Sequence, residues 1–249
     1  MMCYYDVFMM FSLYDFRVFL WTVFSFTSDE TSYIFGIHSF SMPFNTTHPS
    51  ADFLAADEYV DYDSPVIAKK AGDLFSGLSS DVARTEAAFN FVRDEILHIF
   101  DTGEDIITVK ASDVLTKGRG ICHTKSILLA AFLRYVKIPS GFCFERITLA
   151  DDDSEGYCVH CFNAAFVNGR WVFLDTGVNM DGINAEFSPD RPVFAFIPRP
   201  QYDEYFWNGI HARPQHATML MLENAKTRED IFNNIPDYLD EKPDIEHTF

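Results

Sequence analysis

Between about residues 64 and 100, apolar residues recur at helical spacing. The pair Ser64-Pro65 is typical of a helix start, with serine as the N-cap and proline at the first helical position, and we predict a helix to about Phe75. Residues 79–81 indicate a second helix start, and residues 82–100 carry apolar side chains at helical spacing with charges between them. We predict that both helices serve as scaffold.

One predicted helix is apolar nearly all the way round. It begins at Cys122, just after a turn that contains Gly118 and Gly120, and it runs to Val136. A helix without a polar face belongs inside a domain, covered by other elements. The first turn of a helix offers free backbone N–H groups and the positive end of the helix dipole, and both favour a thiolate over a thiol. Cys122 is therefore the candidate nucleophile.

Strand patterns follow this helix. We predict strands over residues 142–149, 157–167 and 170–176, with the acidic residues 151–156 as an exposed turn. Asn168-Gly169, between the last two strands, is a strong signal for a two-residue hairpin turn. The order of elements predicts one α+β domain in which helices pack against an antiparallel sheet.

The hairpin turn determines which residues of its two strands face each other. Val167 pairs with Arg170, and the extended register brings His160 and Asp175 to one face as diagonal neighbours, with backbones roughly 7–8 Å apart. A carboxylate at that position holds the imidazole in one tautomer and stabilises the imidazolium. We therefore predict nucleophilic acyl chemistry through a thioester on Cys122, with His160 as base and Asp175 as orienting residue.

The composition narrows the classes of partner. Hydrophobic residues make up 48% of the 249 residues, which is enough for a sizeable core. The formal charge is −18, from 37 acidic against 19 basic side chains, and it disfavours nucleic acid and anionic membrane surfaces, which bind clustered Lys and Arg. Five cysteines at irregular spacings do not make a disulfide framework, and we predict a reducing, cytoplasmic setting.

The first fifty residues are unusual, because Arg17 is their only Lys or Arg and aromatic residues occur without a clear period. Residues 18–26 resemble the apolar part of a signal peptide, but the segment before them carries Asp6 and Asp15 and no N-terminal positive charge. Three interpretations remain open. In the first, the segment is an extension outside the domain, and the true start of translation is Met42. In the second, it is an aromatic-rich segment that packs on the core. In the third, it is a targeting segment.

The chain divides into three parts. We predict an aromatic-rich extension over residues 1–49, the α+β domain over residues 50–225, and a C-terminal helix with an acidic tail over residues 226–249. Thr227 is the predicted N-cap of that last helix. No pattern in the sequence sets an oligomeric state.

A series of motifs in the second half of the chain resembles the transglutaminase-like superfamily, within the wider papain-like group of cysteine enzymes. The matching motifs are Ala111-Ser112-x-x-Leu115, Gly120-x-Cys122, the apolar helix that ends in Arg134, the Ile138-Pro139 exit, the strand with His160, and the strand from Trp171 to Asp175. The resemblance extends over roughly residues 53–210, and the stretch from Asn179 to Pro189 looks like the continuation found in bacterial, uncharacterised members.

The resemblance implies a papain-like core in which a buried helix carries the cysteine and an antiparallel sheet carries the histidine and the aspartate. It implies Cys122 as nucleophile, His160 as base and Asp175 as orienter. The implied activity is hydrolysis of a peptide or isopeptide bond, or acyl transfer to an amine, with a peptide, protein or small amide as substrate. Water and amines attack the same thioester, so these residues do not distinguish a hydrolase from an acyltransferase.

The chain departs from the family pattern around these residues. Papain-type enzymes place a glutamine upstream of the cysteine for the oxyanion, whereas the only glutamines here are Gln201 and Gln215. Bacterial relatives have glycine after the histidine, where this chain has Cys161, and many have Ala-Arg-Gly after the aspartate, where it has Thr-Gly-Val at 176–178. The calcium-binding loops of the animal enzymes have no recognisable match, and we expect no cofactor.

Two other functions compete with the catalytic one. Cys158, His160 and Cys161 resemble a zinc-ligand cluster, although strand alternation points the two cysteines to opposite faces. A non-catalytic binding module on the same fold is the second alternative.

Overall fold

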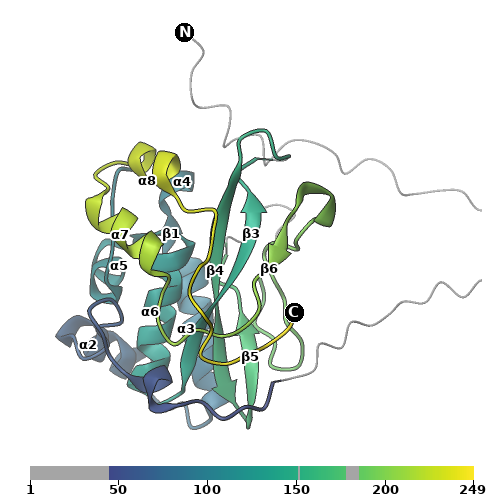
Figure 1. Ribbon diagram of the computed structural model, residues 1–249. Coiled ribbons are helices and arrows are strands. Elements are labelled where there is room, and N and C mark those ends of the chain that lie inside the picture. The colour runs from purple at the N-terminus through teal and green to yellow at the C-terminus, as the bar shows by residue number, and fades with distance from the viewer. Residues whose placement is uncertain (1–44, 151, 178–184) are drawn as a thin grey trace, which may run out of the picture. The chain divides into compact units, whose positions relative to one another are not determined.

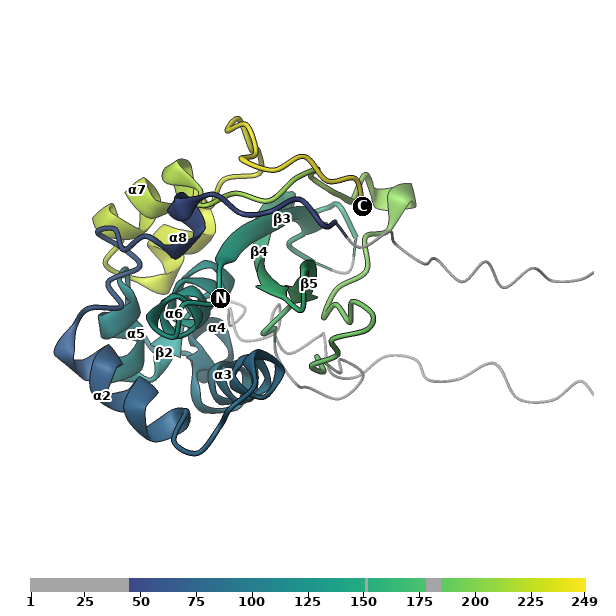
Figure 2. The same cartoon turned by 90° about the horizontal axis from the view of Figure 1, so that it is seen from below.

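Helix α6 (Cys122–Tyr135) lies between a sheet and the other helices (Figures 1 and 2). The computed structural model describes residues 45–150, 152–177 and 185–249. Every residue of α6 from His123 to Arg134 is buried. This confirms the prediction that the apolar helix is covered on all sides.

The helices around α6 come from both ends of the described chain. Helices α2, α3 and α5 pack directly on α6, and α7 contacts α8. The bounds of the α-helices other than α6 are α2 Pro65–Leu74, α3 Asp81–Glu95, α4 Ile99–Thr102, α5 Ala111–Lys117, α7 His216–Asn224 and α8 Arg228–Asn234, and the 3-10 helices are η2 Ala51–Leu54 and η3 Pro200–Tyr202. The predicted starts of α2 and α8 are confirmed, and the hydroxyl of Thr227 accepts the N–H of Asp230 at the start of α8.

Helix α3 ends earlier than the sequence predicts. The periodicity predicts a helix over residues 82–100, but the helix stops at Glu95. The strand β1 (Leu97–His98) then pairs in parallel with β2 (Arg119–Gly120), and the first N–H of β1 binds the carbonyl of Gly118 at 3.1 Å. The prediction is wrong because a distant segment supplies these backbone hydrogen bonds, and local periodicity does not report such a partner. The pairing anchors the glycine turn that leads into α6.

The main sheet has four antiparallel strands in the order β5-β4-β3-β6. The strands are β3 Ser140–Thr148, β4 Tyr157–Val167, β5 Arg170–Leu174 and β6 Tyr205–Phe206. Figure 1 shows the helices gathered to one side of this sheet. The α+β architecture expected from the sequence is confirmed.

The β4–β5 hairpin has the register predicted from its two-residue turn. Val167 pairs with Arg170, and the ladder continues without a bulge to Asn163 and Leu174. The turn residues Asn168-Gly169 have φ of 53° and 77°, the left-handed conformation that a type I′ turn requires. The turn chemistry alone was therefore sufficient to place this pair of strands.

Apolar side chains cover both faces of the sheet. One buried cluster joins the sheet to the helices and includes Phe132, Val159 and Leu174. A second cluster includes Phe162 and Phe173, whose ring centroids lie 6.4 Å apart. Strand side chains alternate between the two clusters because of the pleat. The hairpin residues Phe162 and Phe173 therefore share one face.

Segments from both ends of the described chain pack on this core. Asn45 and Thr47 accept hydrogen bonds from the backbone N–H and the indole Nε1 of Trp171, both at 2.9 Å. Near the C-terminus, Ile245 pairs with Ile210 as an antiparallel bridge. The described residues all belong to one compact unit, so the C-terminal helix and tail pack with the domain core.

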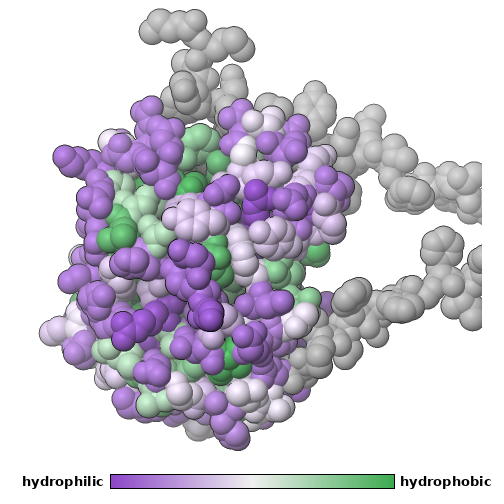
Figure 3. Space-filling view, in the orientation of Figure 1, coloured by the Kyte–Doolittle hydropathy of each residue, from purple (hydrophilic) through white to green (hydrophobic). Residues whose placement is uncertain are grey.

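Most of the predicted N-terminal extension, residues 1–44, lies outside the described residues. Among the helices that the structure describes, none combines the length and the apolar character needed to cross a membrane. On the face shown in Figure 3, hydrophilic residues predominate and apolar residues are scattered among them.

Candidate active site

Cys122 is the first residue of α6, with Ile121 as the N-cap. The hydroxyl of Thr124 accepts the N–H of Ile121 at 3.0 Å, which stabilises the start of the helix. A Cβ at Gly120 would meet the same hydroxyl at 2.6 Å, so this tight turn requires glycine. The N–H of Cys122 has no partner within the helix, because the first residues of a helix lack a carbonyl one turn earlier. The partly exposed thiol therefore lies beside a free donor for a developing negative charge.

His160 and Asp175 meet on the face of the sheet that the hairpin register predicts. Asp175 follows the last residue of β5, and its Oδ1 lies 3.2 Å from Nε2 of His160. Oδ1 also accepts the N–H of Gly177 at 3.0 Å, and Oδ2 accepts the N–H of Ala195 at 2.8 Å. The ring of Phe196 packs edge-on against the imidazole, with centroids 5.2 Å apart. These contacts hold the imidazole in one orientation.

The charges around Cys122 stabilise its thiolate. Burial would raise the pKa of the Cys122 thiol, but the positive charges of His123 and His160 overcome this effect and lower that pKa well below its ordinary value. Burial would lower the pKa of His160, but the negative charges of Asp175 and Cys122 raise it well above its ordinary value. Both shifts favour a thiolate on Cys122 and an imidazolium on His160, which together are the reactive form of a nucleophilic cysteine.

The other cysteines that the structure describes lie in a different environment. Cys143, Cys158 and Cys161 are free thiols, and burial raises the pKa of each one. A thiol with a raised pKa is protonated at neutral pH and reacts slowly. Within the described chain, Cys122 is thus the cysteine whose surroundings favour the thiolate.

His123 brings a second imidazole to the thiol. Its Nδ1 lies 3.4 Å from Sγ of Cys122, and its fully buried ring stacks on Phe144 with centroids 6.1 Å apart. Its Nε2 has no hydrogen-bond partner in the described part of the chain. The sequence-based prediction gave His123 no catalytic role, although its place beside Cys122 was a signal for one. Unlike His160, it is not hydrogen-bonded to a described carboxylate, so His160 is the better candidate for the base.

A second carboxyl group lies beside His160. Glu145 stands opposite His160 in the β3–β4 ladder, and its Oε1 is 3.8 Å from Nε2 of the imidazole. Glu145 is fully buried, neither of its oxygens has a hydrogen-bond partner among the described residues, and burial raises the pKa of its carboxyl well above its ordinary value. The sequence does not reveal this neighbour, because the long acidic loop between β3 and β4 sets no register.

One sequence-family model matches the part of the chain that carries these residues. Residues 68–176, which contain Cys122, His160 and Asp175, match the sequence model of the transglutaminase-like superfamily. The chain contains a transglutaminase-like domain. The match supports a cysteine-enzyme kind of function, and it confirms the family resemblance seen in the motifs.

Two solved structures resemble the domain distantly. A protein from Cytophaga hutchinsonii, provisionally described as a cysteine protease, is 20% identical with a TM-score of 0.40 over 50% of this chain and 40% of its own. A protein from Parabacteroides distasonis, provisionally described as a protease, is 17% identical with a TM-score of 0.34 over 53% of this chain and 27% of its own. The chain thus spans less than half the length of either one. No curated protein matches the sequence.

The transglutaminase-like domain does not gather Cys158, His160 and Cys161 at one point. These residues lie on β4, where alternation sends Cys161 to the face opposite His160. In the described part of the chain, the group of three metal-type donors that does converge is Glu145, His160 and Asp175, with ligand atoms within 4.8 Å of one another. The geometry therefore does not support the predicted cysteine-based zinc site.

Neither glutamine of the chain takes the place of the papain-type oxyanion donor. The side chain of Gln215 donates to the carbonyl of Tyr238 and accepts the hydroxyl of Thr218, both at 2.5 Å. Gln201 is exposed on η3. In the described structure no contact joins either glutamine to Cys122. The described structure therefore places no glutamine where papain-type enzymes have their oxyanion donor.

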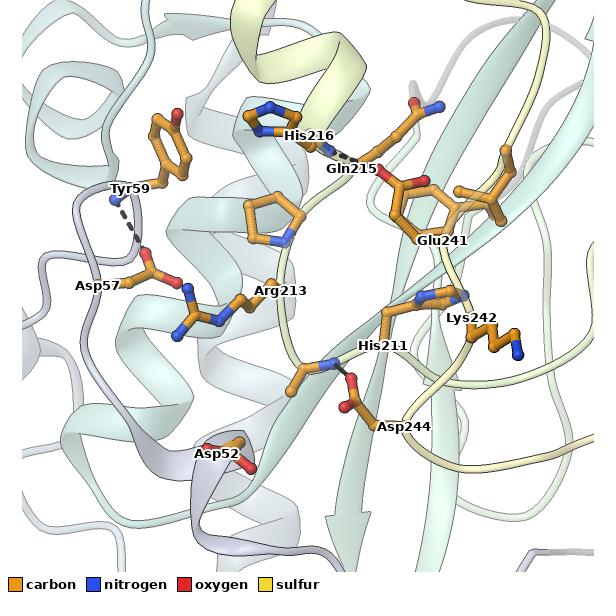
Figure 4. Close-up of a pocket in the computed structure, with 14 residues that line it drawn as sticks. Asp52, Asp57, Tyr59, His211, Arg213, Gln215, His216, Glu241, Lys242 and Asp244 are labelled. Atoms are coloured by element: carbon orange, nitrogen blue, oxygen red, sulfur yellow. Dashed lines mark hydrogen bonds between the residues drawn. The ribbon is translucent and has the colours of Figure 1, made fainter.

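A cavity of about 430 Å³ opens elsewhere in the domain (Figure 4). Acidic and basic side chains line it, and two of its carboxylates, Asp244 and Glu241, accept backbone N–H groups at 2.7 and 2.8 Å. Phe144 lines it as well, and its ring packs edge-on against His211 with centroids 5.2 Å apart. None of the three candidate catalytic residues lines this cavity, so it is not the reaction centre.

Replacing Gly177 with alanine is expected to disturb Asp175. A Cβ at this position would lie 2.4 Å from the Cβ of Ala195 and 3.2 Å from Oδ1 of Asp175, so the segment that donates the second hydrogen bond has to move. We expect a loss of about 1–3 kcal/mol in the free energy of unfolding from overpacking, and a roughly 10- to 100-fold loss of turnover from the misplaced carboxylate. Denaturant titration and turnover measure the two effects. Gly72→Ala is the control, because a Cβ there meets nothing within 4 Å; equal results for the two variants would contradict the argument.

Proposed function

We propose that this chain is an enzyme that breaks an amide bond through a thioester on Cys122, either hydrolysing the bond or transferring the acyl group to an amine. The observation that carries the proposal is the geometry of the site: Cys122 is the first residue of α6, and Nε2 of His160 lies 3.2 Å from Oδ1 of Asp175. The direction of the Cys122 pKa, which the charges of the two histidines lower, agrees with this geometry. The transglutaminase-like match over residues 68–176 supports the same kind of chemistry.

The first half of the reaction forms the thioester. The Cys122 thiolate attacks the carbonyl carbon of the amide, and the resulting oxyanion accepts the free N–H of Cys122 at the start of α6. The C–N bond then breaks, and the imidazolium of His160 gives its proton to the leaving nitrogen, which departs as a neutral amine. The acyl group remains on sulfur and the imidazole is neutral.

The second half releases the acyl group. The neutral imidazole of His160 takes a proton from water or from an acceptor amine, which attacks the thioester carbonyl. The C–S bond breaks, the product is a carboxylic acid or a new amide, and the thiolate–imidazolium pair is restored. Asp175 engages Nε2 throughout, so Nδ1 is the nitrogen that exchanges protons with sulfur and substrate.

The rate at which a thiol-directed probe labels Cys122 is expected to stay high below neutral pH. The pKa of the thiol is lowered, so the thiolate persists as pH falls and is lost only below that lowered pKa. The pKa of His160 is raised, so the imidazolium persists as pH rises and is lost only above that raised pKa. Labelling should therefore level off by neutral pH, whereas amide turnover, which also needs the imidazolium, should fall again at alkaline pH.

Labelling rates across pH, with the labelled residue identified by mass spectrometry, test this prediction. The Cys158→Ser variant serves as the control, because burial keeps the Cys158 thiol protonated and its removal should leave the rate unchanged. Labelling of Cys122 with the midpoint of a free cysteine, about pH 8.5, would remove the main support for an enzyme and favour the binding-module alternative.

A library of peptide amides and isopeptides, read by mass spectrometry, tests the substrate class. We expect acyl–enzyme on Cys122 and release of an amine. Adding a labelled alkylamine separates the two reactions, because a transferase incorporates it into the product and a hydrolase does not. A free, ionised thiol is suited to a reducing compartment, and we infer a cytoplasmic location.

A further inference from the structure

Three side chains converge on the carboxylate side of the His160 imidazole. Glu145 comes from β3, His160 from β4, and Asp175 from the residue that follows β5. One donor atom of each lies within 4.8 Å of the others, and Nε2 of His160 is 3.2 Å from Oδ1 of Asp175 and 3.8 Å from Oε1 of Glu145. Their exposed fractions are 0%, 4% and 1% respectively. The group is a buried cluster of one imidazole and two carboxyls.

The two carboxyl groups of this cluster differ in how they are satisfied. Asp175 accepts backbone N–H groups on both oxygens, from Gly177 and Ala195. Glu145 has no hydrogen-bond partner on either oxygen in the described structure, although it is fully buried and directed at Nε2 of His160. A buried carboxyl without a partner is costly, and the thioester mechanism makes no use of a second carboxyl. The arrangement has one donor more than the proposed reaction needs.

We propose that Glu145, His160 and Asp175 form a binding site for a divalent metal ion, best suited to zinc, and that the bound ion inhibits the reaction at Cys122. Metal binding is inferred from the three donor side chains alone. Inhibition rests on the proposed function, because it assumes that His160 is the base.

The donor set suits zinc better than the common hard cations. Zinc takes imidazole nitrogen and carboxylate oxygen at about 2.0–2.2 Å, so neighbouring donors of a tetrahedral site lie roughly 3.4 Å apart. The observed separations of 3.2 and 3.8 Å from Nε2 are close to this value, and the two carboxylate oxygens lie within 4.8 Å of each other, so Glu145 would have to move inward for all three donors to reach one ion. Calcium and magnesium prefer six or more ligands that are nearly all oxygens, which this group does not supply.

An ion at this position would replace the proton on Nε2, and this changes what Nδ1, the nitrogen that exchanges protons in the mechanism, can do. It would bind Nε2 of His160 in place of the hydrogen bond to Asp175, and metal binding requires that nitrogen to be unprotonated. A metal-bound imidazole cannot become the imidazolium that protonates the leaving amine. With the ion on Nε2, Nδ1 would keep its single proton. It could then accept no proton from water or an amine, and without the imidazolium it would be a far weaker acid toward the leaving nitrogen; removing the ion would restore both roles.

Zinc binding to the full chain, measured by competition with a chromophoric chelator, tests the site without any substrate. We expect one Zn²⁺ per chain. Glu145→Gln keeps the size of the side chain but removes an anionic ligand, and it should weaken binding by more than roughly 100-fold, since even the loss of an outer-shell partner costs 10–100-fold. Cys122→Ser and Cys158→Ser should bind as tightly as the unchanged chain, because no thiol belongs to the site.

The absorption spectrum of Co²⁺ bound to the unchanged chain identifies the ligand atoms without any substitution. Co²⁺ bound through nitrogen and oxygen shows weak visible bands, whereas a thiolate ligand adds a strong sulfur-to-metal charge-transfer band in the near ultraviolet. No Zn²⁺ binding, unchanged binding in Glu145→Gln, loss of binding in Cys122→Ser, or a thiolate band would each overturn the proposed site. Denaturant titration of Glu145→Gln shows whether the variant is folded, and the cobalt spectrum decides if it is not.

The switching effect is read separately. Zinc should abolish amide turnover of the unchanged chain, a chelator should restore it, and Glu145→Gln should need over 100-fold more zinc for the same inhibition. Zinc bound without any effect on turnover would overturn the switch and leave the proposed function intact. Absence of turnover in metal-free protein would overturn the proposed function, whereas zinc binding would still stand or fall on its own measurement.

Discussion

Cys122→Ser is expected to lose at least ~10⁴-fold in kcat/KM for any amide substrate, because the residual rate comes only from binding and the oxyanion donor. A hydroxyl in place of the thiol keeps the size and the start of α6 but has a far higher pKa, so His160 cannot hold it ionised. Turnover of the best library substrate measures the loss, and mass spectrometry should find no acyl–enzyme. The fold should persist, because the replacement removes no buried apolar contact.

Cys143→Ser and Cys158→Ser are the matched controls for this variant. Both thiols are free, and burial raises the pKa of each, so neither replacement should lower kcat/KM by more than its effect on stability explains. A Cys122→Ser protein that keeps its turnover would contradict the assignment of the nucleophile. Loss of turnover in Cys158→Ser at unchanged stability would point to another thiol.

His160→Ala is expected to have the second largest effect, a loss of ~10³-fold or more in turnover, because it removes both the base and one of the two positive charges that lower the thiol pKa. The pH at which labelling of Cys122 is half-maximal should move upward by the same change. His123 remains at 3.4 Å from Sγ, so the midpoint should move upward by less than it would if both imidazoles were removed. The loss of turnover measures the missing base together with the changed thiol pKa, whereas the labelling midpoint measures the thiol pKa alone. Comparing the two separates proton transfer by His160 from stabilisation of the thiolate by its charge.

Two further histidine variants calibrate this result. His216 is exposed at the start of α7, so His216→Ala should leave both readings unchanged. His123→Ala should raise the labelling midpoint but cost less turnover than His160→Ala, because no described carboxylate orients His123. The assignment of the base would be wrong if His123→Ala abolished turnover and His160→Ala did not.

The hairpin shows how far local chemistry reaches. Asn168-Gly169 supplies the left-handed turn, the turn sets the pairing of β4 with β5, and the pairing brings His160 and Asp175 to one face. Each step depends on residues close together in the sequence, so the sequence predicts the contact before any packing is known. The start of α6 at Cys122 is local in the same way.

The features that the sequence did not predict, namely the end of α3 and the position of Glu145, depend on strand pairings between segments that are distant in the sequence. The helix predicted to residue 100 ends at Glu95, because the next residues pair with β2 (Arg119–Gly120). Glu145 faces His160 through the β3–β4 register, which follows a long loop and is set by how the strands bury their apolar faces against α6.

The sequence by itself predicted a cysteine at a helix start, a histidine and an aspartate on one hairpin face, and the resemblance to the transglutaminase-like superfamily that residues 68–176 match. Only the tertiary structure showed which charges lower the pKa of the Cys122 thiol, the hydrogen bond from Ala195 that holds Asp175, and Glu145 beside His160, whose carboxyl has no hydrogen-bond partner among the described residues. The physical reason is that turn and helix signals act over a few residues, whereas desolvation and charge pairing depend on what packs within a few ångströms in space.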